Sequence, residues 1–121
     1  MTPKTALGKK GEDAVAAWLQ QYGFKILERN YQIREGEIDL IAVREEVVAF
    51  IEVKTRTTEY FPTSLVVNIT KQRKIIKAAQ WFVIKNNIID KVLRFDVATV
   101  RFENERCHIS YIKNAFMKQT R

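Results

Sequence analysis

The spacing of hydrophobic residues changes along the chain from the period of a helix to that of a strand and back. Helical spacing predicts a helix at about residues 5–22, before Gly23, and a second helix that is capped by Asn68 or Thr70 and ends near Asn86. Strands are predicted at about residues 24–33, 37–43 and 47–55, of which the last two are rich in Ile, Val, Leu and Phe. Alternation predicts two more strands at about residues 92–102 and 106–112. The order αβββαββ indicates an α/β protein with a mixed central β-sheet flanked by helices.

The second predicted helix has two different sides. Its hydrophobic side is expected to cover the sheet and contains Ile69, Ile75, Ile76, Ala79, Phe82 and Val83. Its basic side contains Lys71, Arg73, Lys74, Lys77 and Lys85. These cations either meet phosphates or are simply solvated. Trp81, on the basic side, either stacks on an unpaired base or packs against protein.

Length and composition limit the class of protein. The 121 residues suffice for one domain, 1–121, with a single core. No hydrophobic run approaches the roughly 18 residues that span a bilayer, and the first residues lack a secretory signal, so we expect a cytoplasmic protein without a membrane partner. Cys107 is the one cysteine, which suits a reducing compartment. The one histidine, His108, follows it directly, and neighbours on a strand face opposite ways, so no local Cys-His pair is expected.

The charge of the chain indicates a polyanionic partner. Lys and Arg number 21 against 14 Asp and Glu, which gives a net charge of +7 and an isoelectric point near 9.7. Nucleic acid is the partner that this excess favours. The alternative is that the charge serves only solubility.

Candidate chemistry comes from acidic residues on two neighbouring predicted strands. Glu37 and Asp39 share one face of the first strand, and Glu52 and Lys54 share one face of the second. If residues 44–47 form the turn, Asp39 lies opposite Glu52 and Glu37 lies opposite Lys54. Opposed carboxylates on an apolar sheet are destabilising unless something compensates their charge.

A divalent cation would supply that compensation. Mg²⁺ and Mn²⁺ prefer oxygen ligands, and Asp39, Glu52 and the carbonyl of Val53 would provide them. The alternative is an ordinary salt bridge between Glu52 and Lys54 or a nearby arginine.

A third candidate carboxylate lies on the first predicted helix. Gly8 and Gly11 each cost this helix about 1 kcal/mol relative to alanine, which indicates that another part of the chain approaches its backbone. Glu12 lies at the edge of the hydrophobic arc, where it could reach the sheet or the water of a bound metal. The alternative is a favourable interaction with the helix dipole.

Four motifs together resemble the YraN family. They are GKKGE at residues 8–12, GEIDLIA at 36–42, AFIEVKTR at 49–56 and RFDV at 94–97. The resemblance extends from about Gly8 to Phe116. That family is related to archaeal Holliday-junction resolvases and belongs to the restriction-endonuclease-like superfamily, whose metal-dependent nucleases carry a D…(D/E)-x-K core. The resemblance therefore implies a restriction-endonuclease-like fold and a metal-dependent endonuclease.

The resemblance also implies roles for individual residues. Asp39 and Glu52 would bind Mg²⁺ or Mn²⁺ together with the carbonyl of Val53. Lys54 would orient the attacking water or stabilise the charge that develops on the phosphate. Glu12 would be an outer metal ligand or accept a proton from water.

Residues that would hold the nucleic acid lie near these positions. They are Arg56, Lys71, Gln72 and Lys74. DNA is the favoured substrate, with branched or flapped DNA of repair or recombination as candidates. Two alternatives remain open, a non-catalytic nucleic-acid-binding module of the same fold and an RNA-processing nuclease. A homodimer is a candidate assembly because related resolvases cut as dimers, whereas a monomer would point to flaps, ends or nicks.

Asp96 is an acidic residue on an otherwise apolar predicted strand. A salt bridge with Arg94, two residues away on the same face, explains it most simply. The RFDV motif of the resemblance is the reason to consider a role in the site instead.

Overall fold

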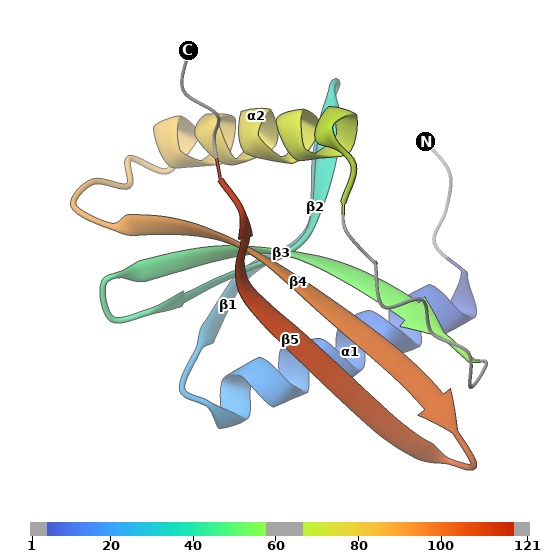
Figure 1. Cartoon of the computed structure of the whole chain (residues 1–121). Helices are drawn as coiled ribbons and strands as arrows, with labels where there is room; N and C mark the ends of the chain where they lie inside the picture. The colour runs from blue at the N-terminus through green and yellow to red at the C-terminus, as the bar shows by residue number, and fades with distance from the viewer. Residues whose placement is uncertain (1–4, 58–66, 118–121) are drawn as a thin grey trace.

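The computed structural model describes residues 5–57 and 67–117, which form a mixed sheet with one helix on each face (Figure 1). The elements are α1 (Ala6–Gln21), β1 (Lys25–Ile33), β2 (Gly36–Arg44), β3 (Val47–Arg56), α2 (Ile69–Lys85), β4 (Val92–Glu103) and β5 (Arg106–Phe116). This order confirms the predicted αβββαββ arrangement and the α/β class. Between the third strand and the second helix, the sequence predicts a loop around Pro62, which lies outside the described residues.

The five strands follow one another across the sheet in chain order, β1-β2-β3-β4-β5. Three neighbouring pairs are antiparallel, and β3 and β4 are parallel. A parallel pair needs a long crossover connection, which α2 provides. Neither helix of the described residues is long and apolar enough to cross a membrane.

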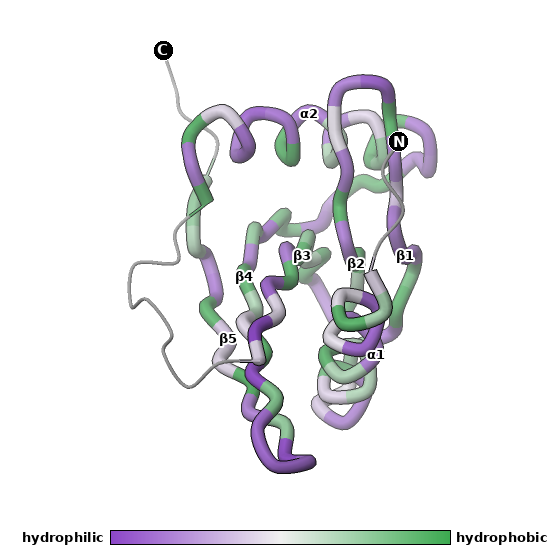
Figure 2. The backbone as a smooth tube through the Cα atoms, turned by 90° about the vertical axis from the view of Figure 1, so that its right-hand side faces the viewer, coloured by the Kyte–Doolittle hydropathy of each residue, from purple (hydrophilic) through white to green (hydrophobic). Residues whose placement is uncertain are grey.

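Each helix packs on its own hydrophobic cluster. Under α2, the rings of Phe50 and Phe95 stack at 5.5 Å, and Phe82 of the helix meets Phe50 edge-on. Under α1, the buried residues include Val15, Leu19, Leu40, Ala49 and Ile51. In Figure 2, α2 carries its hydrophobic positions on the side toward the strands. The central strands β2, β3 and β4 are therefore largely buried on both faces, whereas the edge strands β1 and β5 are mostly exposed.

The helix boundaries agree with the sequence signals. The Asn68 side chain accepts a hydrogen bond from the Lys71 amide at 2.8 Å, so Asn68, not Thr70, is the N-cap of α2. Thr5 caps α1 in the same way. Gly23 has a φ of +88°, the left-handed conformation that ends a helix at glycine without strain.

Two details of the pattern are wrong or incomplete. Ile69 is exposed, because it is the first residue of α2 and precedes the part of the helix that contacts the sheet. The last strand continues beyond Ile112 to Phe116, which stacks on Phe95 at 5.3 Å. A register shift in the β4–β5 pairing and the positive φ of Asn114 hide this extension from a simple alternation. On the basic side of α2, Trp81 is 52% exposed.

The most important difference between the predicted and the observed sheet is the extent of the pairing between β2 and β3. The predicted register is confirmed from Val43–Val48 to Leu40–Ile51, where the pairing stops. Beyond that point β2 pairs only with β1, while β3 continues along β4 to Arg56. The two strands therefore separate immediately before the acidic residues.

The separation of β2 from β3 has a visible cause in the packing. Ile38 belongs to the cluster under α2, and Leu40 belongs to the cluster under α1, so strict alternation is interrupted at Asp39. At the start of β2, a Cβ on Gly36 would lie 2.8 Å from the Lys74 carbonyl oxygen of α2. Glycine thus lets this end of the strand pack directly against the helix, beside which β2 rises in Figure 1. Asp39 and Glu52 are consequently not ladder partners as predicted.

The same separation overturns the second predicted pairing. Glu37 pairs with Gln32 of β1 and Lys54 pairs with Thr99 of β4, so Glu37 and Lys54 do not face each other in a ladder. The prediction extended an antiparallel ladder that in fact ends three residues earlier.

Candidate active site

A pocket of about 250 Å³ lies where β2 leaves β3. Its lining comes from the start of α1, the end of β3 and the start of α2: Thr5, Leu7, Gly8, Glu12, Glu52, Val53, Lys54, Thr55, Arg56 and Lys71. The helices cover opposite faces of the sheet (Figure 1). Side chains from both faces therefore reach one pocket because the sheet is interrupted there.

Within the described part of the chain, Glu52 is one of the two acidic residues that line this pocket. It is 6% exposed, and its Oε2 lies 2.6 Å from Nζ of Lys71. Burial raises the pKa of Glu52 above its ordinary value, and the nearby charge of Asp39 raises it further. Lys71 and Lys54 act in the opposite direction without cancelling this effect. The protein therefore leaves the ionised form of Glu52 incompletely compensated.

Asp39 is held beside Glu52 by the backbone of β3. It is 4% exposed, and its Oδ2 accepts a hydrogen bond from the Val53 amide at 2.8 Å. The carboxylate thus bonds to β3 just past the last ladder pair, Leu40–Ile51. Asp39 is therefore fixed beside Glu52 at the point where β2 leaves β3, which we call the fork, although the two residues are not ladder partners.

Glu12 enters the site from α1. It is 2% exposed, and its Oε1 lies 3.9 Å from a guanidinium nitrogen of Arg29, which pairs more closely with Asp13 at 2.6 Å. A Cβ on Gly11 would collide with the Thr55 side chain of β3. Glycine thus allows the close approach that the sequence predicts here, and this approach brings Glu12 into the same pocket as Glu52.

Gly8 differs from Gly11. Its nearest neighbour outside the helix backbone is the hydroxyl of Thr5, the cap of its own helix. The close contact predicted for both glycines therefore applies to Gly11, while Gly8 contributes to the pocket lining.

Of the predicted nucleic-acid contacts, two lie in the pocket and two do not. Arg56 and Lys71 line it together with Lys54, so three cations border the buried carboxylates. Gln72 instead donates its amide hydrogen to the Val67 carbonyl at 2.7 Å. Lys74 is exposed where α2 meets the start of β2.

The residues at the fork fit a hard divalent ion through two carboxylates rather than three. Within residues 5–57 and 67–117, no three Asp, Glu, His or Cys side chains converge as a group that could hold a metal ion. Asp39, Glu52 and the Val53 carbonyl offer hard oxygen donors, and Mg²⁺ commonly takes one or two carboxylates with water or phosphate. Burial and the nearby charge of Asp39 raise the pKa of Glu52, which is the direction expected for a buried carboxylate whose charge is not fully compensated.

Asp96 belongs to a separate cluster. It is fully buried, and it pairs with Arg94 at 3.0 Å, which confirms the predicted salt bridge. It also accepts hydrogen bonds from the Tyr111 hydroxyl at 2.5 Å and the Asn114 amide at 3.0 Å. Asp96 is not among the residues that line the carboxylate pocket.

Sequence reasoning missed Arg29 and Thr5 as neighbours of the site. Thr5 carried a usable signal, because a threonine before a helical pattern is a common N-cap and places the helix start. Arg29 carried none, since its position depends on how β1 packs against α1.

Comparison with known proteins identifies the chain's relatives. The profile of the uncharacterised protein family UPF0102 matches residues 11–100, which include the acidic residues of the pocket. A UPF0102 protein of Geobacter metallireducens is 43% identical over 112 residues, 92% of each chain. UPF0102 proteins of Desulforapulum autotrophicum and Chloroherpeton thalassium are 42% and 41% identical over 115 and 125 residues, at least 93% of each chain. The chain therefore belongs to the uncharacterised protein family UPF0102, which is the YraN family.

Proposed function

We propose that this protein is a metal-dependent endonuclease that hydrolyses phosphodiester bonds in DNA. One observation carries the proposal: buried Asp39 and Glu52 adjoin a pocket that Lys54, Arg56 and Lys71 border. The three basic residues would not favour a neutral or cationic substrate. The two carboxylates would not favour a phosphate that is bound by basic residues alone. Together the two sets of groups suit a phosphate whose hydrolysis needs a hard metal ion.

Mg²⁺ or Mn²⁺ is the proposed cofactor. Asp39, Glu52 and the Val53 carbonyl would hold the ion. When bound, it would neutralise charge on the phosphate and lower the pKa of a water molecule. Glu52 now contacts Lys71 at 2.6 Å, so binding of the ion would compete with this lysine for the carboxylate.

Lys54 and Glu12 are the residues proposed to act on the attacking water and on the charge of the transition state. Lys54 lines the pocket close enough to Glu52 for its charge to act on the pKa of that residue. It would orient the attacking water or stabilise the negative charge of the transition state. Glu12, buried on the α1 side of the same pocket, would accept a proton from that water.

Substrate binding would rest on the cations at the pocket rim. Arg56 is exposed, and Lys71 is half-exposed at the start of α2. Each would contact a phosphate next to the scissile bond and release counterions. Lys74 lies farther along α2 and would meet a more distant phosphate, while Gln72 would hold Val67, just before the helix, through its side-chain amide.

A second candidate function is a nucleic-acid-binding module without catalysis. The Lys71–Glu52 contact at 2.6 Å favours it, because this ion pair partly compensates the carboxylate without any metal. The carboxylates argue against it, since they would repel phosphate and weaken a pure binder.

The test is a cleavage assay on labelled linear, flap and four-way-junction DNA and on RNA of matched sequence. Each substrate is incubated with Mg²⁺, Mn²⁺ or EDTA, and the assembly state is measured by sedimentation in parallel. The site variant is Glu52→Gln. The matched control is Glu46→Gln, the same change on an exposed turn.

Metal-dependent cleavage that Glu52→Gln loses and Glu46→Gln keeps would support the endonuclease, and the best substrate would name its class. Cutting of RNA alone would favour the processing nuclease. Binding of every substrate without cleavage would contradict the endonuclease and favour the binding module. A dimer would suit symmetric junctions, and a monomer would suit flaps, ends or nicks.

A further inference from the structure

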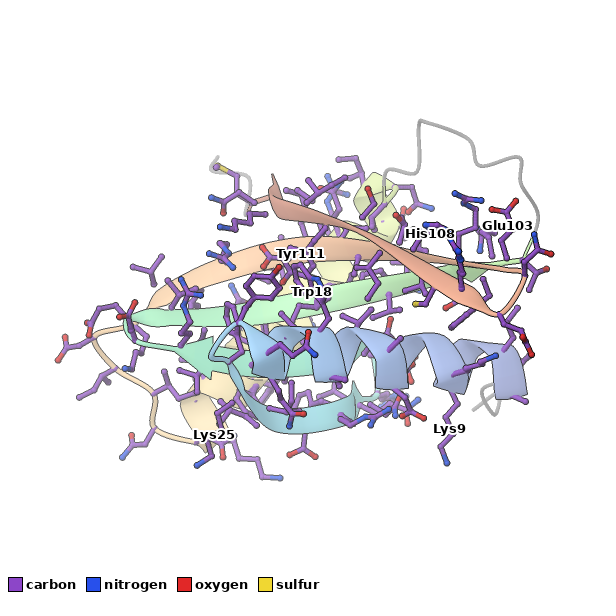
Figure 3. The ribbon with its side chains drawn as sticks, turned by 90° about the horizontal axis from the view of Figure 1, so that it is seen from below. Lys9, Trp18, Lys25, Glu103, His108 and Tyr111 are labelled. Atoms are coloured by element: carbon purple, nitrogen blue, oxygen red, sulfur yellow. The ribbon has the colours of Figure 1, made fainter. Side chains whose placement is uncertain are left out.

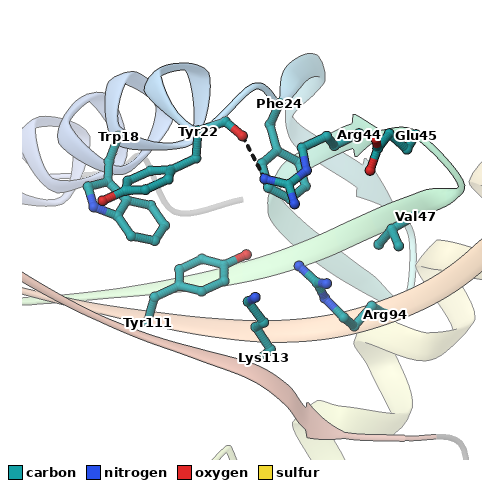
Figure 4. Close-up of a pocket in the computed structure, with 9 residues that line it drawn as sticks. All are labelled: Trp18, Tyr22, Phe24, Arg44, Glu45, Val47, Arg94, Tyr111 and Lys113. Atoms are coloured by element: carbon teal, nitrogen blue, oxygen red, sulfur yellow. Dashed lines mark hydrogen bonds between the residues drawn. The ribbon is translucent and has the colours of Figure 1, made fainter.

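A second pocket, also of about 250 Å³, lies at the opposite end of α1 from the carboxylates. Figure 4 shows the side chains that line it, which come from α1, from four strands and from the connections next to them: Trp18, Tyr22, Phe24, Arg44, Glu45, Val47, Arg94, Tyr111 and Lys113. Figure 3 shows Trp18 of α1 and Tyr111 of β5 together at one end of the helix, with Lys9 near the other end. This composition combines aromatic faces with positive charge.

The aromatic rings form the wall of this pocket. The Trp18 ring lies 4.7 Å from the Tyr22 ring and 4.9 Å from the Tyr111 ring, measured between centroids. Tyr22 is 56% exposed, so its ring is accessible to a ligand. Trp18 and Tyr111 pack partly on the hydrophobic cluster under α1, and together with Tyr22 they also line the pocket. Flat, accessible rings are the surfaces on which unpaired bases stack.

The charged groups of this pocket favour an anion. Two cations, Arg44 and Lys113, are exposed, and Glu45 is the one acidic residue in the lining. Arg44 is fixed in place by donating to the Tyr22 carbonyl at 2.7 Å and by lying 5.2 Å over the Phe24 ring. A preorganised guanidinium of this kind suits a phosphate.

We propose that this second pocket binds an unpaired nucleobase of a DNA single strand, with Arg44 and Lys113 on its phosphates. The proposal rests on the proposed function and extends it to a strand-positioning site. The pocket is small for an organic ligand, which matches one base rather than a whole cofactor. Tyr22, the C-cap of α1, follows Glu12 by ten positions, about 15 Å along the helix axis. One strand could thus occupy both pockets, which favours flapped or branched DNA over an uninterrupted duplex.

The test follows Trp18 fluorescence in full-length protein carrying Trp81→Phe, which removes the other tryptophan. The protein is titrated in EDTA with a short labelled oligothymidylate and with the same backbone made abasic. Anisotropy of the label reports binding, and quenching of Trp18 reports stacking in the pocket. The variants are Tyr22→Ala and Lys113→Ala, with Lys25→Ala as the control for loss of an exposed lysine.

We expect the oligothymidylate to quench Trp18 and the abasic strand to quench it much less. Tyr22→Ala should weaken binding of the oligothymidylate by about 5- to 10-fold and of the abasic strand little. Lys113→Ala should lower the slope of log affinity against log salt by about one for both strands, and Lys25→Ala should leave quenching unchanged.

Other outcomes separate this proposal from the endonuclease. Binding by anisotropy without quenching, and without loss in Tyr22→Ala, would overturn the pocket proposal while leaving the carboxylate site intact. Quenching and weakened binding in the variants, combined with no metal-dependent cleavage, would support the pocket and contradict the endonuclease. No binding of either strand would overturn the pocket proposal.

Discussion

Two centres of buried negative charge lie on neighbouring strands of the same sheet, and they are built in opposite ways. Asp96 of β4 is paired in register with Ile51 of β3, directly before Glu52. Yet Asp96 faces a set of donors inside the protein, while Glu52 faces a pocket. The two carboxylates thus lie on adjacent strands, one residue apart in register.

The charge of Asp96 is compensated by groups inside the protein, so we call Asp96 and its partners the balanced centre. Arg94 contacts both carboxylate oxygens, and the Tyr111 hydroxyl and Asn114 amide add two further hydrogen bonds. Burial works against the charge of Arg94, but its interactions with Asp96 prevail and raise the pKa of the guanidinium. Burial and the charge of Asp96 raise the pKa of Tyr111, so the phenol stays protonated as a donor. No group from outside is needed.

The fork at Asp39 and Glu52 is not balanced in this way. The pKa of Glu52 remains raised despite Lys71 and Lys54, because burial and Asp39 outweigh both lysines. A buried carboxylate whose oxygens all have partners inside the protein needs no further ligand, whereas one that faces a pocket with its charge undercompensated is suited to binding a cation. The comparison thus distinguishes a structural acid from a candidate functional one.

The most damaging change to the balanced centre is Asp96→Asn. It leaves the Arg94 guanidinium, 14% exposed, without its counter-charge, so we expect a loss of about 3–5 kcal/mol in the free energy of unfolding. Urea denaturation measures it. Asp39→Asn is the matched change at the fork and should cost far less. An Asp96→Asn protein as stable as the wild type would show that the two centres do not differ as argued.

A divalent metal ion should stabilise the protein by binding at the fork and not at the Asp96 cluster. At a concentration 100 times its dissociation constant, Mn²⁺ or Mg²⁺ should stabilise the wild type by about 2.7 kcal/mol, because it binds the folded state. Thermal unfolding with and without the ion measures this. Glu52→Gln should lose the stabilisation, and Asp96→Glu at the balanced centre should keep it if that variant folds. Equal stabilisation of wild type and Glu52→Gln would place the ion elsewhere.

Tyr111→Phe is a smaller change at the Asp96 cluster than Asp96→Asn, because it removes one hydrogen bond and no charge. It keeps the ring and removes the hydroxyl that donates to Asp96 at 2.5 Å. A hydrogen bond to a charged group contributes about 1.5–3 kcal/mol, so we expect urea unfolding to show a loss of about 2 kcal/mol. Tyr31→Phe is the control, since the Tyr31 ring packs on Phe82 and keeps that contact. A loss no larger than the control's would mean that Arg94 alone balances Asp96.

The fold was predictable from sequence where one local signal decides it. Asn68 and Gly23 mark helix ends through their own side chain or backbone freedom, and Gly11 predicts a close approach by lacking a Cβ. The αβββαββ order followed from hydrophobic period alone. Each of these signals resides in a few adjacent residues.

The details of the site were less predictable, because they depend on packing between distant segments. The predicted pairing of Asp39 with Glu52 is wrong because the part of β2 before Leu40 leaves β3 and packs against α2. The contacts that cause this join distant segments, so no local sequence pattern predicts them. Gln72 and Lys71 are neighbours on one basic helix, yet one bonds to Val67 and the other to Glu52. The prediction that Asp39, Glu52 and Val53 hold a metal stays a prediction.

The smallest expected effect is the pH dependence of the fork. Because the pKa of Glu52 is raised in the folded protein above its ordinary 4.5, the folded state holds a proton that the unfolded chain releases. The contribution of Glu52 to stability is therefore greatest below about pH 4.5 and is lost as pH rises through its folded-state pKa. One group changes the free energy of unfolding by at most about 1.4 kcal/mol per pH unit, and the two lysines reduce this slope.

Glu52→Gln should remove this loss, so in EDTA the variant should gain stability relative to the wild type as pH rises above about 4.5. Urea unfolding of both proteins across that range measures the difference, which cancels the titration of all other groups. Glu46→Gln, on the exposed turn, should show no such trend. A Glu52→Gln protein that instead loses stability as pH rises would mean that Lys71 fully compensates the carboxylate. The fork would then be as balanced as the Asp96 cluster, and the argument for a metal there would fail.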